Sequence, residues 1–423
     1  MARKKSKQRN KEKSTENVLQ IEELGWHGDG IADVNGKRVF VPFTLAGESV
    51  RAMVTGSQAK VLEVLYASPE RVEAHCEYYS KCGGCGVQHL AFETYCQWKR
   101  QIIERALLNR HIEAPVEALI DGHGSGRRRV NLHVQYVDGQ VQAGFMQAQS
   151  HNLVDIKSCP ILAPQLEKAT DISRDVAGHL LNTSKALKIQ LTVSETGLDC
   201  TIMGAGKLDL DARIGLSDCA NDHDLARLSV SDDIILERRA PILVFGAGKV
   251  VLPPGGFLQA TLSGEEILSN IVLDGVSGAK KIADLYCGLG PFSLRMAAHS
   301  PVMSFDSDEV AIAALQMAAY HVQGQKPVTA ETRDLSENPL HSSELNLFDA
   351  VVFDPPRAGA ESQAREIASS KVASVVAVSC NAATFARDAS ILIDGGYRLE
   401  KVSPVDQFRF TGHVEMVGVF KRG

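Results

Sequence analysis

Reactive side chains lie beside apolar runs near the end of the chain. Cys380 comes directly after one run, and Asp354-Pro355-Pro356 comes directly after another. A cysteine at a strand end before a helix can act as a thiolate nucleophile. Glu415 and His413 come just before a third run, and either is a candidate general base. The pattern predicts a nucleophile, a rigidly held carboxylate and a base around one cleft.

A glycine turn follows the apolar run 282–285. Gly288 and Gly290 allow a tight bend and a close approach of the backbone to a ligand. Asp306 ends the next apolar run, where an acidic side chain can accept hydrogen bonds from ribose hydroxyls. The third glycine of the dinucleotide pattern and the GxxxxGK[ST] phosphate loop are both missing. A mononucleoside such as S-adenosylmethionine is therefore favoured over NAD or ATP.

Four of the nine cysteines form a separate pattern. Cys76, Cys82 and Cys85 lie close together around a Gly83-Gly84 pair, and Cys159 follows far downstream before a proline. Four thiolates suit a tetrahedral Zn²⁺ ion or an iron–sulfur cluster. The spacing alone prefers neither.

The surrounding pattern of glycines and apolar residues predicts the elements that position these groups. Residues 17–66 contain short alternating runs separated by glycine and polar turns, which is typical of a small β-barrel. Residues 92–110 predict a helix, and residues 127–146 predict a hairpin that turns at Asp138-Gly139. From about residue 246, strands alternate with helices and predict a parallel doubly wound sheet, with ligands at the carboxyl ends of its strands.

Composition and charge narrow the class of protein. The chain has 423 residues, of which 44% are hydrophobic, and no apolar run approaches the ~18 residues that cross a membrane. Its first residues lack the apolar stretch of a secretory signal, so we expect a cytoplasmic protein. Residues 1–13 carry seven Lys or Arg and one Glu, on a chain of net charge −6. This arm and the triplet Arg127-Arg128-Arg129 are either RNA contacts or solvated surface.

The chain resembles the bacterial RNA (uracil-5-)-methyltransferases that use S-adenosylmethionine. The resemblance runs from about residue 15 to 420, and its most specific motifs are Asp354–Gly359, Ser379-Cys380-Asn381 and Thr411–Glu415. It implies an α/β fold with a C-terminal Rossmann-like, doubly wound methyltransferase domain, an N-terminal TRAM/OB-like barrel and a central α+β domain. The implied boundaries are a basic disordered tail at 1–14, the barrel at 15–70, the iron–sulfur and central domain at 71–245 and the methyltransferase domain at 246–423.

The same resemblance implies the roles of individual residues. Cys380 would add to C6 of uracil, C5 would then take the methyl group, and Glu415 would remove the C5 proton. Asp354 would lie near the base and the methyl group. The implied cofactor-binding residues are Gln259, Tyr286, Gly288, Pro291, Asp306, Asp334 and Asp354. Pro291 replaces an Asn of some relatives and Asp306 replaces a common Glu, so contacts to the cofactor differ there.

The resemblance also favours a [4Fe–4S] cluster on Cys76, Cys82, Cys85 and Cys159. It indicates 23S rRNA as the substrate, with tRNA as the alternative, and we expect a monomer that binds no membrane. An amino-group methyltransferase built on Asp354-Pro355-Pro356 would leave Cys380 and Glu415 without roles. A radical enzyme would use a Cys-x3-Cys-x2-Cys loop, and a non-catalytic RNA chaperone would show a broken site.

Overall fold

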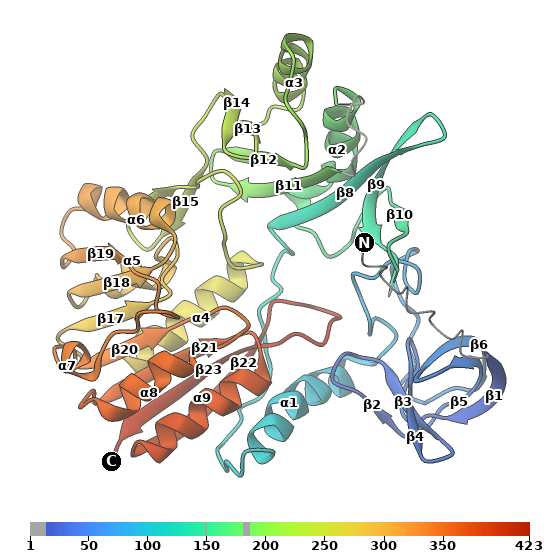
Figure 1. Cartoon of the computed structure of the whole chain (residues 1–423), viewed down its shortest axis with the longest axis horizontal. Coiled ribbons are helices and arrows are strands. Elements are labelled where there is room, and N and C mark those ends of the chain that lie inside the picture. Colours follow the sequence, from blue (N-terminus) through green and yellow to red (C-terminus); the bar gives the residue numbers. More distant parts are fainter. Residues whose placement is uncertain (1–13, 149, 181–186) are drawn as a thin grey trace, which may run out of the picture. The chain divides into compact units, whose positions relative to one another are not determined.

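The computed structural model describes residues 14–148, 150–180 and 187–423, which divide into two compact units (Figure 1). The smaller unit contains the chain up to Ser80, residues 84–98 and the short segment 410–412. The larger unit contains residues 81–83, 99–409 and 413–423. The predicted tail at 1–14 lies outside the described residues except for its last residue.

Six short strands build the sheet of the smaller unit, as the pattern of residues 17–66 predicts. Buried Val50, Ala52 and Val54 alternate along one strand with residues that are more exposed, so one face of this sheet forms a core with Leu19 and Val41. The strand order is β1-β5-β6-β4-β3-β2. The strands are β1 Thr15–Gln20, β2 Glu23–Leu24, β3 Gly30–Val34, β4 Lys37–Val41, β5 Ser49–Thr55 and β6 Gln58–Tyr66.

A seven-stranded, largely antiparallel sheet forms the central part of the larger unit, with the order β10-β9-β8-β11-β12-β13-β14. The predicted hairpin is β8–β9, and its turn residues Asp138 and Gly139 both have positive φ, as a type I′ turn requires. The strands and helices here are β8 Arg129–Val137, β9 Gln140–Met146, β10 Leu153–Asp155, α2 Ala169–Gly178, β11 Leu187–Ser194, β12 Gly197–Met203, α3 Leu210–Asp222, β13 Arg227–Val230 and β14 Asp233–Glu237, with a 3-10 turn at Pro164–Leu166. A separate hairpin, β15 Ile242–Phe245 and β16 Gly248–Val251, follows.

An eight-stranded sheet with the order β19-β18-β17-β20-β21-β23-β22-β7 forms the C-terminal part of the larger unit. Helices lie along this sheet in Figure 1, and β17, β20 and β21 are buried along their whole length. The strands are β7 Ile120–Asp121, β17 Ile282–Leu285, β18 Val302–Asp306, β19 Val328–Thr332, β20 Ala350–Phe353, β21 Ser374–Ser379, β22 Tyr397–Asp406 and β23 Glu415–Arg422. The helices are α4 Leu262–Gly275, α5 Pro291–Met296, α6 Glu309–His321, α7 Ser342–Leu345, α8 Glu361–Ser369 and α9 Ala382–Asp394.

The sheet is not parallel throughout, which corrects the expectation of an all-parallel sheet. The five strands from β19 to β21 are parallel, but β23 runs antiparallel to β21 and to β22. The last two strands form a hairpin, so β23 enters between β21 and β22 in the opposite direction. Residues at the start of β23 therefore lie at the same edge as residues that follow β21.

The predicted helix at 92–110 is α1, Phe92–Leu108, whose residues up to Trp98 belong to the smaller unit. No helix in the described part of the chain combines the length and the apolar character that a bilayer crossing requires.

Candidate active site

One edge of the C-terminal sheet gathers the side chains that the sequence singles out for catalysis. Tyr286, Asp354 and Cys380 directly follow the parallel strands β17, β20 and β21, so their backbones share this edge. Ser379 pairs with Met416 across β21 and β23, which brings the neighbouring residues Cys380 and Glu415 together. The structure thus joins the predicted nucleophile, carboxylate and base.

Cys380 lies in a negatively charged setting. Burial, followed by the carboxylates of Glu415 and Asp354, raises the pKa of its thiol to about 11, and the Arg357 guanidinium acts against them. The side chain is half-buried. Because the thiol is the dominant form at neutral pH, a reaction through Cys380 needs a group that accepts its proton or a ligand that stabilises the thiolate.

Glu415 is the most enclosed of the three side chains, with only 4% of its surface exposed. Burial and then the charge of Asp354 raise its pKa to about 8, against a hydrogen bond from Gln407 and the charges of Arg357 and Lys99. Its Oε2 atom is buried and has no hydrogen-bond partner in the described part of the protein. A carboxyl group poised near pH 8, with one oxygen unsatisfied, is suited to accept a proton from a bound ligand.

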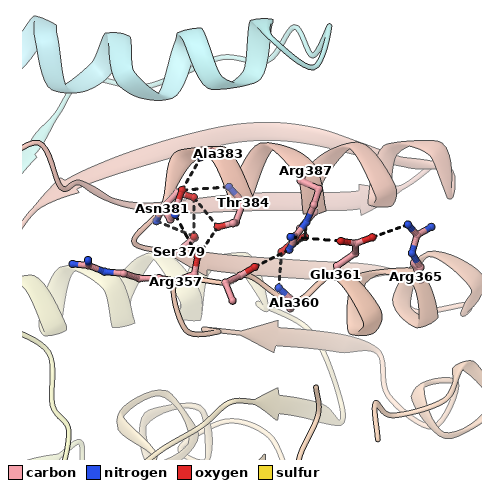
Figure 2. Close-up of polar contacts among 11 residues, drawn as sticks. Arg357, Ala360, Glu361, Arg365, Ser379, Asn381, Ala383, Thr384 and Arg387 are labelled. Carbon is pink, nitrogen blue, oxygen red and sulfur yellow. Dashed lines mark hydrogen bonds and ion pairs between the residues drawn. The ribbon is translucent and has the colours of Figure 1, made fainter. Parts of the chain in front are cut away.

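Asp354 begins a loop that is fastened to α9. Burial raises the pKa of Asp354 to about 7, and a hydrogen bond of 3.1 Å from Gln259 Nε2 lowers it in part. Figure 2 shows the loop contacts. Asn381 caps α9 with its side-chain oxygen and donates through Nδ2 to the carbonyl of Arg357 at 3.3 Å. The cap therefore holds this loop as well as the helix.

The far end of the same loop is held by a second pair of side chains. Arg387 donates to the carbonyl of Ala358 at 3.0 Å, and Asp388 accepts from the backbone N–H of Ala360 at 2.7 Å. Gly359 has a φ of +76°, a conformation that residues with a side chain rarely adopt, so this point of the loop favours glycine. Together with Pro355 and Pro356, these contacts leave the loop little freedom.

The glycine turn follows β17, the strand that pairs with β20. Tyr286, Gly288 and Gly290 all have positive φ, and a Cβ atom at Gly290 would lie 2.4 Å from Leu315. The backbone N–H of Gly288 donates to Asp306 Oδ2 at 2.8 Å. This hydrogen bond joins the glycine turn to the last residue of β18. A Cβ atom at Gly288 would meet nothing within 4 Å, which leaves open space in front of the turn for a ligand.

The remaining predicted cofactor residues surround this turn. Pro291 is the first residue of α5, where its fixed φ fits a helix start. Burial raises the pKa of Tyr286, and the nearby charges of Asp388, Asp334 and Asp306 add to this effect. Asp334 is exposed, and its Oδ1 accepts from the backbone N–H of Ser336 at 2.9 Å.

Arg128, the middle residue of the arginine triplet 127–129, is not a solvated surface residue. Arg128 is buried, its guanidinium pairs with Glu265, and its Nε donates to the carbonyl of Gln259 at 3.1 Å. Glu265 also pairs with Arg295 at 2.9 Å. The flanking arginines face aromatic rings: Arg129 lies 4.9 Å above the ring of Phe257. The buried pair fixes the backbone at Gln259.

The four predicted metal ligands divide between the units. Cys76 and Cys85 belong to the smaller unit, whereas Cys82 and Cys159 belong to the larger one. Among residues 14–148, 150–180 and 187–423, no three or more His, Cys, Asp or Glu side chains gather closely enough to hold a metal ion. The prediction of a cluster is therefore not confirmed.

Three contributors to the site were missed by reasoning from the sequence. Gln407 is fully buried and contacts Gln259, and Lys99 is fully buried in an ion pair of 2.7 Å with Asp406. Arg357 acts on the pKa of both Cys380 and Glu415. Gln407, beside a strand, and Lys99, in a helix, belong to no recognisable sequence motif. Arg357 could have been found, since it follows Asp354-Pro355-Pro356 directly.

Comparisons with known proteins agree on one family. A family model described as tRNA (Uracil-5-)-methyltransferase matches residues 268–422, and a TRAM domain model matches residues 10–63. An uncharacterized RNA methyltransferase of Brucella suis is 43% identical over 405 residues, which cover 96% of this chain and 98% of the relative. The 23S rRNA (uracil(1939)-C(5))-methyltransferase RlmD of Vibrio vulnificus is 29% identical over 425 residues, covering 95% of each chain.

A solved structure shares the fold. The tRNA (uracil-54, C5)-methyltransferase of Pyrococcus abyssi, in complex with S-adenosyl-L-homocysteine, superposes with a TM-score of 0.73 at 22% identity. The match covers 96% of this chain and 100% of that one.

Proposed function

The chain belongs to the RNA uracil-5-methyltransferase family, and from that premise we propose that it forms 5-methyluridine in 23S rRNA through a covalent bond to Cys380. The observation that carries the proposal is the convergence of Cys380, Glu415 and Asp354 at one sheet edge, where the two carboxylates act on the thiol. An amino-group methyltransferase would need neither the thiol nor the buried glutamate.

The proposed reaction begins when the half-buried Cys380 thiol releases its proton to solvent and becomes the thiolate. The sulfur of Cys380 forms a bond to C6 of uracil, and the C5–C6 electron pair moves to the ring as an enolate. C5 then attacks the methyl group of the sulfonium, the sulfur–methyl bond breaks, and S-adenosylhomocysteine is left. Glu415 takes the C5 proton, the C5–C6 double bond re-forms, and the Cys380 thiolate leaves. The uridine has to leave its stack to reach these groups.

The glycine turn is the proposed site of the methyl donor. The open space before Gly288 admits a ligand next to Asp306, whose carboxylate is suited to ribose hydroxyls. We assign Tyr286, Pro291 and Asp334 to the same site. Gln259 and Asp354 would lie at its boundary with the uracil, because the Gln259 amide is hydrogen-bonded to Asp354.

The choice of 23S rRNA rests on similarity along nearly the full length of the chain to a protein named as a 23S rRNA enzyme. The archaeal tRNA enzyme shares the fold at lower sequence identity, so tRNA is the alternative substrate. The sheet of the smaller unit, within the region matched by the TRAM model, is the proposed contact with RNA outside the target nucleotide.

A [4Fe–4S] cluster on Cys76, Cys82, Cys85 and Cys159 is a separate proposal, supported by the sequence resemblance alone. No step above uses it, and the described residues do not gather into a metal site. Iron and acid-labile sulfide would be measured in anaerobically purified protein, with Cys85→Ser as the variant. About four of each per chain would support a cluster, and equal low contents in both proteins would reject it.

Methyl transfer from labelled S-adenosylmethionine to unmodified 23S rRNA and tRNA transcripts tests the function. We expect label in 5-methyluridine of 23S rRNA, its loss in Cys380→Ala, and its retention in Cys219→Ala, which removes a buried thiol of α3 instead. Label in tRNA would overturn the choice of substrate. Label on a base nitrogen, or undiminished label with Cys380→Ala, would overturn the covalent mechanism.

A further inference from the structure

Glu265 lies in the first turn of α4, and its side chain is fully buried. Its two carboxylate oxygens bind two different arginines. Oε2 pairs with the Arg128 guanidinium, and Oε1 accepts from Arg295 Nη2 at 2.9 Å. Arg128 is buried, and only 13% of the Arg295 side chain is exposed. Three charged residues that are distant in the chain thus form one ion network inside the larger unit.

Each arginine of this network also holds a backbone carbonyl. Arg128 Nε donates to the carbonyl of Gln259 at 3.1 Å, and the backbone N–H of Arg128 donates to the next carbonyl at 3.0 Å. Arg295 Nη1 donates to the carbonyl of Pro291 at 2.8 Å. Glu265 is therefore the shared partner of the two side chains that fasten Gln259 and Pro291.

Gln259 and Pro291 both belong to the proposed site of the methyl donor, although they come from separate segments. Pro291 begins α5 directly after the glycine turn, and the Gln259 amide donates to Asp354 at 3.1 Å. A binding site places a small ligand accurately only when its parts keep their spacing. The ion network supplies such a constraint, because it ties the backbone of both segments to one carboxylate.

We propose that Glu265, acting through Arg128 and Arg295, is a positioning residue that sets the spacing of Gln259 and Pro291 for binding S-adenosylmethionine. This inference rests on the proposed function and adds the residue that organises its cofactor site. Because Glu265 is fully buried and both of its oxygens bind arginine, its effect on the ligand has to pass through the two arginines.

The charges of the network indicate how it can be tested without unfolding the protein. A buried guanidinium that lacks an anion is costly, and two that share a site would also repel each other. Removing Glu265 therefore leaves two buried cations without their carboxylate. Removing Arg295 instead leaves a balanced pair of Arg128 and Glu265.

Two variants follow from this difference. Arg295→Met deletes the guanidinium and its hydrogen bond to the Pro291 carbonyl, but it keeps the apolar part of the side chain and the remaining ion pair. Glu265→Gln keeps the shape of the side chain and removes the charge that both arginines share. The first variant protects the fold, and the second tests the residue named in the proposal.

Asp199→Asn is the matched control. Asp199 and Arg227 form an ion pair of 2.8 Å, and both side chains are buried to the same degree as Glu265 and Arg128 or more deeply than Arg295. The pair joins β12 to β13 in the central sheet, which carries none of the proposed cofactor residues. This control shows what the loss of a buried charge does to the protein away from the site.

The measurement is the binding of S-adenosylmethionine and S-adenosylhomocysteine to each full-length protein by titration calorimetry in the absence of RNA. Initial rates of methyl transfer to a 23S rRNA transcript at saturating S-adenosylmethionine then give kcat, and thermal melts of the ligand-free proteins give stability. Binding of the cofactor depends neither on the identity of the RNA nor on the bond to Cys380. It therefore tests the network separately from the proposed reaction.

We expect the Kd for both ligands to rise about tenfold in Arg295→Met and further in Glu265→Gln, since a hydrogen bond that involves a charged group is worth about that factor. The kcat at saturating cofactor should stay close to that of the native protein. Adding Glu265→Gln to Arg295→Met should raise the Kd by a smaller factor than Glu265→Gln alone, because the link to Pro291 is already lost. Asp199→Asn should lower the melting temperature and leave both Kd values unchanged.

Other outcomes would overturn the inference. Native Kd values in folded Arg295→Met and Glu265→Gln would show that the network does not set the cofactor site. An equal rise of the Kd in Asp199→Asn would assign the effect to lost stability, and a native Kd with a reduced kcat would place Glu265 in a later step. A native protein that binds both ligands but methylates C5 of uridine in neither 23S rRNA nor tRNA would instead overturn the proposed function.

Discussion

Asp306 and Glu415 lie at the same edge of one sheet, but their surroundings are opposite. Asp306 accepts backbone N–H groups on both oxygens, from Gly288 at 2.8 Å and from Asp308 at 2.9 Å. Glu415 is buried, and its Oε2 has no hydrogen-bond partner in the described part of the chain. The first arrangement fixes a carboxylate in place, whereas the second favours a carboxyl group that gains and loses a proton. Carboxyl groups at one edge of the sheet can therefore serve two purposes, ligand binding and proton transfer, because their surroundings differ.

Among the variants that test this difference between Asp306 and Glu415, Glu415→Gln is expected to have the largest effect on activity. The change keeps the shape but removes the proton acceptor, so multiple-turnover methylation should fall by about 10²–10⁴-fold. The first methyl transfer should persist, and methylated RNA should remain bound to Cys380. Single-turnover methyl transfer and denaturing gels measure the two effects. Rapid turnover with no bound RNA would remove Glu415 from the proposed mechanism.

Asp306→Ala should affect binding and not proton transfer. Loss of the carboxylate leaves the Gly288 turn without its anchor and the ribose without an acceptor, so the KM for S-adenosylmethionine should rise about 10- to 100-fold. The ratio of proton release to methyl transfer should not change. Initial rates at varied S-adenosylmethionine concentration test this. A changed ratio would contradict the division between the two carboxylates.

Stability at high pH should also distinguish the two carboxylates. The folded pKa of Glu415 is about 8, above its ordinary value of 4.5. Its contribution to stability is therefore complete below about pH 4.5 and is lost as the pH rises through about 8. Glu415→Gln should melt at a higher temperature than the native protein at pH 9, by about 2–4 °C for each kcal/mol gained. A lower melting temperature at pH 9 would contradict the burial of a charge at this position.

Asn381→Ala should produce the smallest change. It removes the cap of α9 and the hydrogen bond to the loop carbonyl of Arg357, for a loss of about 1 kcal/mol of unfolding free energy. Because the loop carries Asp354, kcat should fall more than the affinity for S-adenosylmethionine. Denaturant melts and initial rates measure both. Thr384→Val is the control, because it removes the other hydrogen bond to the Arg357 carbonyl, also at 3.3 Å, and one to the Asn381 carbonyl at 3.2 Å, but leaves the side-chain cap of α9 in place. If the two variants had equal effects on stability and on kcat, the Asn381 cap would have no special role in holding the loop.

The sequence predicts which residues lie at the ends of the strands better than it predicts the contacts between residues that are distant in the chain. Strands β17, β20 and β21 are visible as apolar runs. Asp354 stands out because two prolines follow it, and Cys380 stands out because it lies between a strand and a helix. The direction of β23 has no local signal, since an apolar run reads the same way in a parallel and an antiparallel strand. Gln407 and Lys99 also escape prediction, because their roles depend on partners about 150 and 300 positions away in the chain.

The arginine triplet teaches a related lesson about charge. Three adjacent cations predict a solvated or RNA-binding turn, but Arg128 forms an ion pair with Glu265, which is distant in sequence. Composition cannot reveal such a pair, because burial of one ion is favourable only when its partner is already in place. The metal ligands remain a prediction, because their spacing is distinctive but two of the cysteines belong to each of the two units.

The place of β23 also has a consequence for how the protein is made. This strand follows β21 and β22 in the chain but lies between them in the sheet, and it begins with Glu415. A nascent chain that has already emerged as far as β22 has Cys380 but lacks the glutamate and the strand that joins its neighbours. The order β21-β23-β22 cannot form until synthesis has reached β23. The event that closes the sheet thus also adds the proposed base, so unfinished chains cannot complete the reaction on RNA.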